Sequence, residues 1–217
     1  MARGKAIETL DVWDGHLTDL GGQLLAARLR LVADLQPHLA AAYAQVAGAD
    51  AVPAALGYSS TVAAAGDGTP LVPDADLPDA RALTAAMAER VAERRGDELD
   101  RGVTLVGPHR DDLVIHLGPA PAKGFASHGE SWSLALGLKL ATFALLRGDG
   151  EDPILILDDV FATLDAERRA ALATVARSAE QTLITAAVLE DVPAELRGVR
   201  VEVADGAVTV LDGGEAA

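Results

Sequence analysis

Three carboxylates follow a run of four apolar residues, Ile-Leu-Ile-Leu, at 154–157. Asp158 and Asp159 come directly after this run, and Asp165 lies a short distance further along the chain. A continuous apolar run predicts a strand buried on both faces, as in a parallel sheet. Open α/β sheets bind ligands at the carboxyl ends of their strands, and carboxylate oxygens there suit Mg²⁺ carried on nucleotide phosphates. We therefore predict a nucleotide site here. The plain alternative is a solvated turn in which Asp165 caps the next helix.

A second polar cluster, Ser127-His128-Gly129-Glu130, precedes an apolar segment that begins at Trp132. Ser-x-x-Glu before an apolar run is typical of a capping box, in which the serine and the glutamate satisfy backbone N–H groups at a helix start. The same N–H groups, with a glycine that permits close approach, can bind phosphate. Both interpretations stay open, because capping and phosphate recognition can use these donors at different times.

The elements that position these residues alternate between helix and strand in the second half of the chain. This order predicts a βαβ arrangement with a parallel sheet, and hence an α/β fold. The Asp205-Gly206 pair predicts a hairpin turn near the C-terminus, and we expect residues 213–217 to be disordered. The expected helices are 131–146, 166–178 and a short one near 193–196, and the expected strands are 154–157, 181–186, 199–203 and 208–211.

The first half of the chain predicts a long helix over residues 9–48. Thr9 or Asp11 could cap its start, Pro37 should kink or break it, and Gly48 could end it. The glycine pair at 21–22 should weaken its middle. An apolar stripe with heptad-like spacing favours core packing, and a protruding helical arm is the alternative. The stripe consists of Trp13, Leu17, Leu20, Leu24, Ala27 and Leu31.

Residues 49–80 are rich in Pro, Gly, Ala and Asp and predict a loop-rich connection with a short strand near 56–64. A helix over 80–95 follows, with Asp79 as its cap. Two β-like runs come next, at 103–106 and 113–117. The change of pattern places a domain boundary near residue 100, which gives a helical arm domain (1–100) and a C-terminal lobe (101–217).

Composition limits the possible functions. The formal net charge is −15 and there are no cysteines, so the sequence shows no basic patch for nucleic acid and excludes disulfides and thiolate metal sites. The five histidines lack metal-ligand spacing.

Residues 107–112, Gly-Pro-His-Arg-Asp-Asp, favour a turn held by local hydrogen bonds and ion pairs, with an active patch as the alternative. No signal peptide or membrane span is visible, so we expect a cytoplasmic protein without membrane contact.

Four segments in this order resemble a known family. The segments are Leu10–Asp14, Gly107–Asp112, Ala126–Glu130 and Leu157–Asp165. The last two resemble the signature helix, Walker B strand and D-loop of ABC-type ATPase heads. Together the four resemble the RecF family of bacterial recombination mediators, which are SMC-like. The resemblance covers about residues 8–211, and it implies a C-terminal head lobe with a signature helix and a terminal hairpin, joined to a helical arm.

The resemblance also implies roles for individual residues. Asp158 would order the Mg²⁺ of bound ATP, and Asp159, where most ABC ATPases carry glutamate, would position the attacking water in a slow hydrolysis. Asp165 would be the D-loop residue at the dimer interface. Thr185 stands at the switch position, where many heads have a histidine. The signature residues Ser127, His128, Gly129 and Glu130 would contact the ATP of a partner subunit.

One departure from the family is the absence of a P-loop. The only lysines are Lys5, Lys123 and Lys139, and none stands in a Gly-x-x-x-x-Gly-Lys motif followed by Ser or Thr. The simplest account is that the sequence is the C-terminal part of a longer protein. We therefore expect little or no ATP hydrolysis by this chain alone, and an incomplete sheet that exposes an edge or an apolar face.

The resemblance implies an activity for the intact protein. It would bind DNA at single-strand/double-strand junctions, dimerise through ATP held between two heads, and act with RecO and RecR in recombinase loading, replication restart and SOS induction. Two alternatives remain: a non-catalytic head that dimerises with or regulates an intact ATPase, and a metal-dependent phosphohydrolase or nuclease that uses Asp158, Asp159 and Asp165 as ligands.

Overall fold

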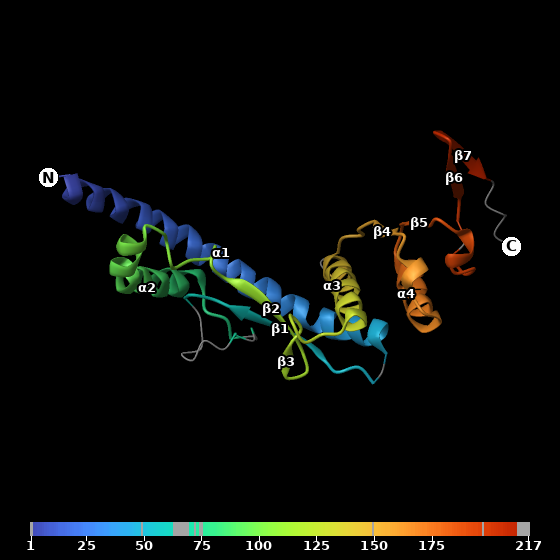
Figure 1. The fold of residues 1–217 in the computed structure, drawn as a ribbon, viewed down its shortest axis with the longest axis horizontal. Helices are drawn as coiled ribbons and strands as arrows, with labels where there is room; N and C mark the ends of the chain where they lie inside the picture. Colours follow the sequence, from blue (N-terminus) through green and yellow to red (C-terminus); the bar gives the residue numbers. More distant parts are fainter. Residues whose placement is uncertain are drawn as a thin grey trace.

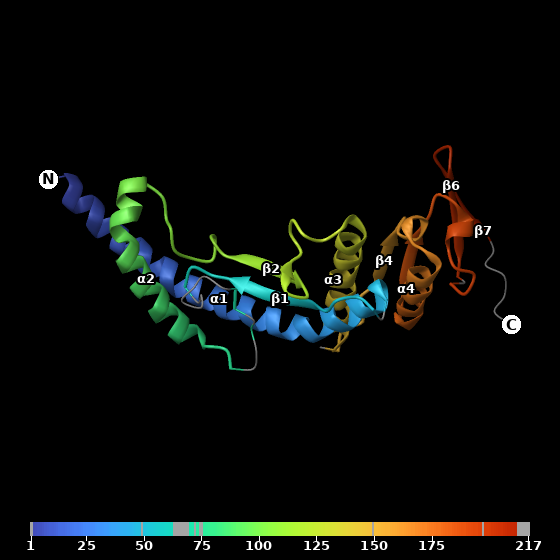
Figure 2. The ribbon, with the colours of Figure 1, turned by 60° about the horizontal axis from the view of Figure 1, so that its bottom comes forward.

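The protein is elongated, and its two ends lie at opposite ends of the long axis in the computed structural model (Figure 1). A long helix and a second helix form one end, a small antiparallel sheet lies in the middle, and two helices with a parallel strand pair and a hairpin form the other end (Figure 2). The structure describes residues 2–48, 50–62, 70–71, 73, 76–148, 150–196 and 198–211.

The first helix, α1 (Ala2–Ala47), is longer than predicted and continuous. It begins before Thr9 and Asp11, so neither residue caps it, and the prediction that Pro37 breaks it is wrong. Proline removes a single backbone donor, and the burial of Leu39 beyond it shows that packing holds the helix together through this point. Gly48 ends the helix as predicted, with φ +93°.

The predicted core stripe of α1 is wrong, because the fold buries a different face. Trp13 is 65 % exposed and Leu20 is 64 % exposed, and of the stripe only Leu17 packs against buried residues. The buried face lies next to the predicted one, with steps of three, four or seven residues. It comprises Leu25, Leu29, Val32, Leu39, Tyr43 and Val46.

The second helix, α2 (Ala80–Arg101), packs against the N-terminal half of α1. Asp79 caps it as predicted, because its carboxylate accepts the Ala82 N–H at 2.7 Å. The glycine pair of α1 allows this close packing: a Cβ added to Gly22 would lie 2.6 Å from the Thr84 nitrogen. A Cβ added to Gly21 would likewise lie 2.6 Å from the Met87 sulfur.

The central sheet has three antiparallel strands, β1 (Ala54–Ser59), β2 (Asp112–Leu117) and β3 (Ala120–Pro121). Strand β1 begins and ends earlier than predicted. The expected strand at 103–106 is absent, because Val106 is buried within a turn instead. Strands β1 and β2 pair from Ala54↔Leu117 to Ser59↔Asp112, across the position predicted for a boundary. The division into domains 1–100 and 101–217 stays a prediction.

The C-terminal part confirms the α/β class. Helix α3 (His128–Gly148) is followed by β4 (Leu155–Asp158), helix α4 (Ala166–Ser178) and β5 (Thr182–Thr185). Strands β4 and β5 are parallel, in a register that pairs Leu155 with Thr182. This is the predicted βαβ arrangement.

The strand pair is covered on one face only. Leu155 and Leu157 pack into the core with residues of α3 and α4, whereas Ile156 is 65 % exposed and Leu183 also faces solvent. The expectation of burial on both faces is therefore wrong for β4 in this chain. The expectation of an exposed apolar face is confirmed.

The last described elements are a short 3₁₀ helix, η2 (Leu189–Asp191), and the hairpin β6 (Arg200–Ala204) and β7 (Ala207–Leu211). The helix lies before the predicted 193–196, where the described residues form a turn. The hairpin is confirmed: Asp205 and Gly206 form its turn with φ of +50° and +77°. Residues 213–217, expected to be disordered, lie outside the described residues. No helix in the described part of the chain is both long and apolar enough to cross a membrane.

Candidate functional site

Asp158, Asp159 and Thr185 meet at the carboxyl ends of the parallel strands β4 and β5. Asp158 pairs in register with Thr185, and the Thr185 hydroxyl donates a hydrogen bond to the Asp158 carboxylate. The Asp159 N–H donates to both the carbonyl oxygen and the hydroxyl oxygen of Thr185, each at 3.1 Å. A single threonine therefore fixes the position of both acidic residues.

The backbone of Asp159 is in the left-handed region, with φ +50°. A non-glycine residue there is uncommon, and such conformations persist where the surrounding structure holds them, often at functional sites. The two hydrogen bonds from the Asp159 N–H to Thr185 supply that restraint. The carboxylates of Asp158 and Asp159 remain exposed at the end of the sheet.

These carboxylates suit Mg²⁺ that arrives with a nucleotide. Mg²⁺ is commonly held by one or two carboxylates, with substrate phosphates and water completing its shell. Within the described ranges, no group of three or more His, Cys, Asp or Glu side chains could hold a metal ion by itself. The residues fit a nucleotide-borne ion, and they do not form an all-protein metal site.

The Ser127–Glu130 segment forms the capping box that its sequence predicts. The Ser127 N–H donates to Glu130 Oε2 at 2.8 Å, and the Glu130 N–H donates to Ser127 Oγ at 3.2 Å. Hydrogen bonding with Ser127 lowers the pKa of Glu130. The Ser127 side chain has the larger effect and its backbone the smaller one. His128 and Gly129 are exposed, and a Cβ added to Gly129 would meet nothing within 4 Å. This helix start is therefore open to a ligand or partner.

Asp165 caps α4 as predicted, and two arginines of that helix hold the preceding segment. Asp165 Oδ1 accepts the Arg168 N–H at 2.9 Å, and Oδ2 accepts from Arg168 Nη1 at 2.9 Å. Arg169 Nη2 donates to the carbonyl oxygens of Phe161 at 3.1 Å and Leu164 at 3.4 Å. The connection between β4 and α4, which includes the 3₁₀ helix η1 (Phe161–Thr163), is thus held by side chains of α4.

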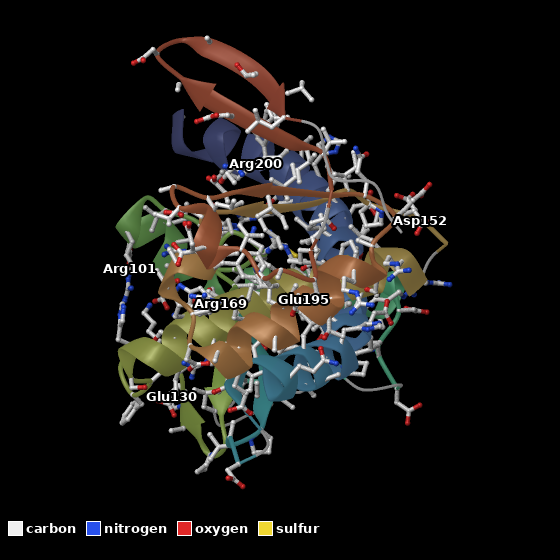
Figure 3. All side chains as sticks on the ribbon, turned by 90° about the vertical axis from the view of Figure 1, so that its right-hand side faces the viewer. Arg101, Glu130, Asp152, Arg169, Glu195 and Arg200 are labelled. Carbon is white, nitrogen blue, oxygen red and sulfur yellow. The ribbon has the colours of Figure 1, made fainter. Side chains whose placement is uncertain are left out.

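The predicted site residues form two separate groups. Asp158, Asp159 and Thr185 are joined by hydrogen bonds, and no hydrogen bond in the described part of the chain links them to Ser127–Glu130. Glu130 lies in the first turn of α3, and Arg169 lies on α4 (Figure 3). Glu130 and Arg168 instead line a shared cavity of about 290 Å³.

The turn at residues 107–112 is structural. The carboxylate of Asp111 accepts hydrogen bonds from Tyr58, Ser60 and Thr61, with the Thr61 N–H at 3.0 Å from Oδ1. The Arg110 side chain donates to the Thr104 carbonyl at 3.1 Å. The local hydrogen bonds expected for this turn are observed at Arg110, but the expected ion pairs are not: in the described residues neither Arg110 nor Asp111 forms one.

Sequence reasoning missed Arg168 and Arg169. One signal was available for Arg168: it lies three residues after Asp165, and a charged pair at this spacing on a helix can interact. Nothing in the sequence indicates that the same side chain reaches α1, because that contact joins residues 122 positions apart.

No family model matches the chain. Its fold matches two solved structures of the recombination mediator protein RecF in the RecFOR pathway, one described as RecF-ATPrS and one as RecF-ATP. Both have a TM-score of 0.74, with 21 % and 20 % sequence identity, and the match covers 94 % of this chain and 51 % of theirs. At this identity the match shows the fold alone, and it is the α/β fold of about half of a RecF chain.

Curated relatives show a closer similarity in sequence. The chain is 53 % identical over 213 residues to the "DNA replication and repair protein RecF" of Beutenbergia cavernae, covering 94 % of this chain and 53 % of the relative. It is 56 % identical over 201 residues to RecF of Rhodococcus erythropolis, covering 89 % and 48 %. It is 52 % identical over 216 residues to RecF of Kineococcus radiotolerans, covering 95 % and 55 %. The chain is a homologue of RecF, and it spans about half the length of the relatives it matches.

Proposed function

We propose that this chain is the part of a RecF-type DNA replication and repair ATPase that supplies the Walker B carboxylates and the signature helix. The observation that carries this proposal is the placement of Asp158 and Asp159 at the carboxyl ends of β4 and β5, held there by Thr185. Identity of 52–56 % to RecF over nearly the whole chain supports it.

In this proposal each of the two groups serves a different ATP molecule. Asp158 holds the Mg²⁺ carried by the ATP of its own head, and Asp159 orients and polarises the attacking water. Bound Mg²⁺ supplies charge neutralisation at the phosphates. Ser127, His128, Gly129 and Glu130 present the open N-terminus of α3 to the γ-phosphate of a partner's ATP. Asp165 lies at the same interface.

Thr185 has a positioning role in this proposal. Its hydroxyl donates to Asp158 and accepts from the Asp159 N–H, so both sides of the oxygen are engaged. A threonine hydroxyl is a poor proton acceptor, so it does not replace a switch histidine as a base. With an aspartate at position 159 and no base at 185, hydrolysis is slow, and ATP serves to hold two heads together.

The phosphate cradle comes from a P-loop lobe that this sequence does not contain. The exposed outer face of β4 and β5, with Ile156 and Leu183, is the surface that such a lobe would cover. The assembled protein would act in the cytoplasm. It would clamp DNA near single-strand/double-strand junctions and act with RecO and RecR in recombinase loading, replication restart and SOS induction.

The test uses the chain assembled with a RecF-type P-loop lobe and compares Gly129→Ala with Gly148→Ala, both on α3. A Cβ at either position meets nothing within 4 Å, and alanine favours helix, so neither change should harm the fold. Sedimentation should show dimers with ATP and monomers with ADP. Gly129→Ala should weaken the ATP-dependent dimer by at least about tenfold, because its Cβ would keep the γ-phosphate from the backbone N–H groups, at the cost of about one hydrogen bond to a charged group. Gly148→Ala should leave it unchanged.

Absence of an ATP-dependent dimer in the unaltered assembly would contradict the proposal. Binding of an intact ATPase without any contribution of Asp158 or Asp159 would favour the non-catalytic regulatory head instead. The phosphohydrolase alternative is disfavoured, because Asp158, Asp159 and Asp165 do not form a metal-binding group in the described structure.

A further inference from the structure

The C-terminal end of α1 meets the starts of α3 and α4 around one cavity. The cavity has a volume of about 290 Å³ and opens partly to solvent. Its lining residues come from the end of α1, the loop after it, the first turns of α3, and α4. They are Tyr43, Ala47, Asp50, Ala51, Val52, Glu130, Ser133 and Arg168. The arm helix, the signature helix and the helix after the D-loop thus share one junction.

Arg168 is the side chain that bonds two of these elements together. Its Nε donates to the carbonyl oxygen of Val46 at 3.1 Å, in the last turn of α1. Its Nη1 donates to Asp165 Oδ2 at 2.9 Å. The last carbonyl groups of a helix lack intrahelical partners and carry partial negative charge, so a guanidinium is a favourable partner for them.

Polar groups of α1 and α3 face the same cavity. Burial raises the pKa of Tyr43, the charge of Glu130 raises it further, and Arg168 lowers it, so both charges act on this phenol. Ser133 Oγ is fully buried and has no hydrogen-bond partner in the described part of the chain. The cavity leaves room for the end of α1 to shift relative to α3, whereas Arg168 ties that end to Asp165.

We propose that Arg168 is a positioning residue that couples the end of the arm helix α1 to the D-loop residue Asp165. A displacement of the arm then moves Asp165, and the position of Asp165 in turn biases the arm. This inference rests on the proposed function, because it assigns Asp165 to the ATP-dependent interface. A lysine cannot replace the arginine fully, since its single ammonium lacks the planar fork that serves two separated acceptors.

Hydrogen exchange of backbone amides tests the coupling directly, without ATP. Four variants are compared with the unaltered protein: Arg168→Ala, Arg168→Lys, Arg169→Ala and Arg177→Ala. Arg177 is exposed on the same helix, and its side chain has no hydrogen bond or ion pair within the described residues. The reporter amides are Gly48 and Ala51, just after α1, and Leu164, directly before Asp165.

Arg168→Ala should speed exchange at both reporter sites by roughly tenfold, the size expected for a lost hydrogen bond to a charged group. Arg168→Lys should give a smaller increase. Arg169→Ala should affect only Leu164, because Arg169 bonds the Phe161 and Leu164 carbonyls and does not bond α1. Arg177→Ala should change neither site. Amides in the middle of α3 report global unfolding and should stay unchanged in every variant.

The coupling is overturned if Arg168→Ala leaves the exchange rates of Gly48 and Ala51 unchanged. It is also overturned if exchange at the reporter amides speeds up only as much as exchange at the α3 reference amides. A failed ATP-dependent dimer with intact exchange coupling would instead count against the proposed function. If the exchange coupling and the ATP-dependent dimer are both observed, Arg168→Ala in the assembled head should weaken ATP-dependent dimerisation. Binding of ATP to the monomer should be retained.

Discussion

Glu130 takes part in the capping box of α3 and in the proposed contact with a partner's ATP. The Ser127 N–H donates to its carboxylate, and Ser127 lowers its pKa. A carboxylate whose pKa is depressed on folding binds its proton less readily in the folded state than in the unfolded state. Its ionised form therefore stabilises the fold, fully above the ordinary glutamate pKa of about 4.3.

This gives a pH prediction for the stability of the protein. The unaltered protein should be more stable than Glu130→Gln near neutral pH, and this advantage should shrink below about pH 4.3 as the carboxylate is protonated. Chemical unfolding at a series of pH values measures the difference. Glu180→Gln, an exposed change on the loop after α4, serves as the control. An advantage that grows on acidification would show that the capping hydrogen bond does not favour the ionised form.

At the scale of elements, the packing of α1 on α2 depends on glycine. Gly22 faces the backbone of α2, where an added Cβ would lie 2.6 Å from the Thr84 nitrogen and 2.8 Å from its Cα. Backbone atoms cannot move aside as a flexible side-chain end can. The glycine pair thus lowers local helix propensity but permits a close helix–helix contact.

Two glycine-to-alanine changes on α1 should therefore have opposite effects. Gly22→Ala should lower the free energy of unfolding by about 1–3 kcal/mol, the usual cost of overpacking, despite its gain in helix propensity. Gly15→Ala should raise it by roughly 0.5–1 kcal/mol, because its added Cβ meets nothing within 4 Å. Urea unfolding curves measure both values. Equal changes would mean that α1 and α2 do not pack as described.

At the scale of the whole molecule, the end away from the arm carries much exposed apolar surface. Ile156 and Leu183 face solvent on the strand pair, Ile154 does so just before β4, and the valines of the β6–β7 hairpin do so on both strands. An apolar patch of this kind marks an interaction surface or a risk of aggregation.

The chain by itself should self-associate in a concentration-dependent way. The double change Ile156→Lys and Leu183→Lys should reduce this with little loss of stability, because both side chains are already exposed. Leu157→Lys, at a buried position of the same strand, should prevent folding instead. Light scattering and sedimentation distinguish these outcomes. A monomeric unaltered chain at high concentration would show that the apolar face does not drive self-association.

The sequence by itself determined the local features of this protein. The caps at Asp79, Ser127–Glu130 and Asp165, the Asp205-Gly206 turn and the βαβ order are all observed, because each depends on residues only a few positions apart. Asp158 ends strand β4 and Asp159 follows it, as their apolar flank predicts, and the motif order identified the RecF resemblance.

Only the tertiary structure decided which faces are buried and which distant residues meet. The heptad-like stripe of α1 is as apolar as the buried face beside it, so periodicity cannot choose between them, and packing against α2, β1 and α3 made the choice. Pro37 and the glycine pair suggested interruptions, but packing energy summed over a long helix exceeds a local propensity cost. The contacts of Thr185 with Asp158 and of Arg168 with Val46 join residues far apart in the sequence, and only the folded chain brings them together.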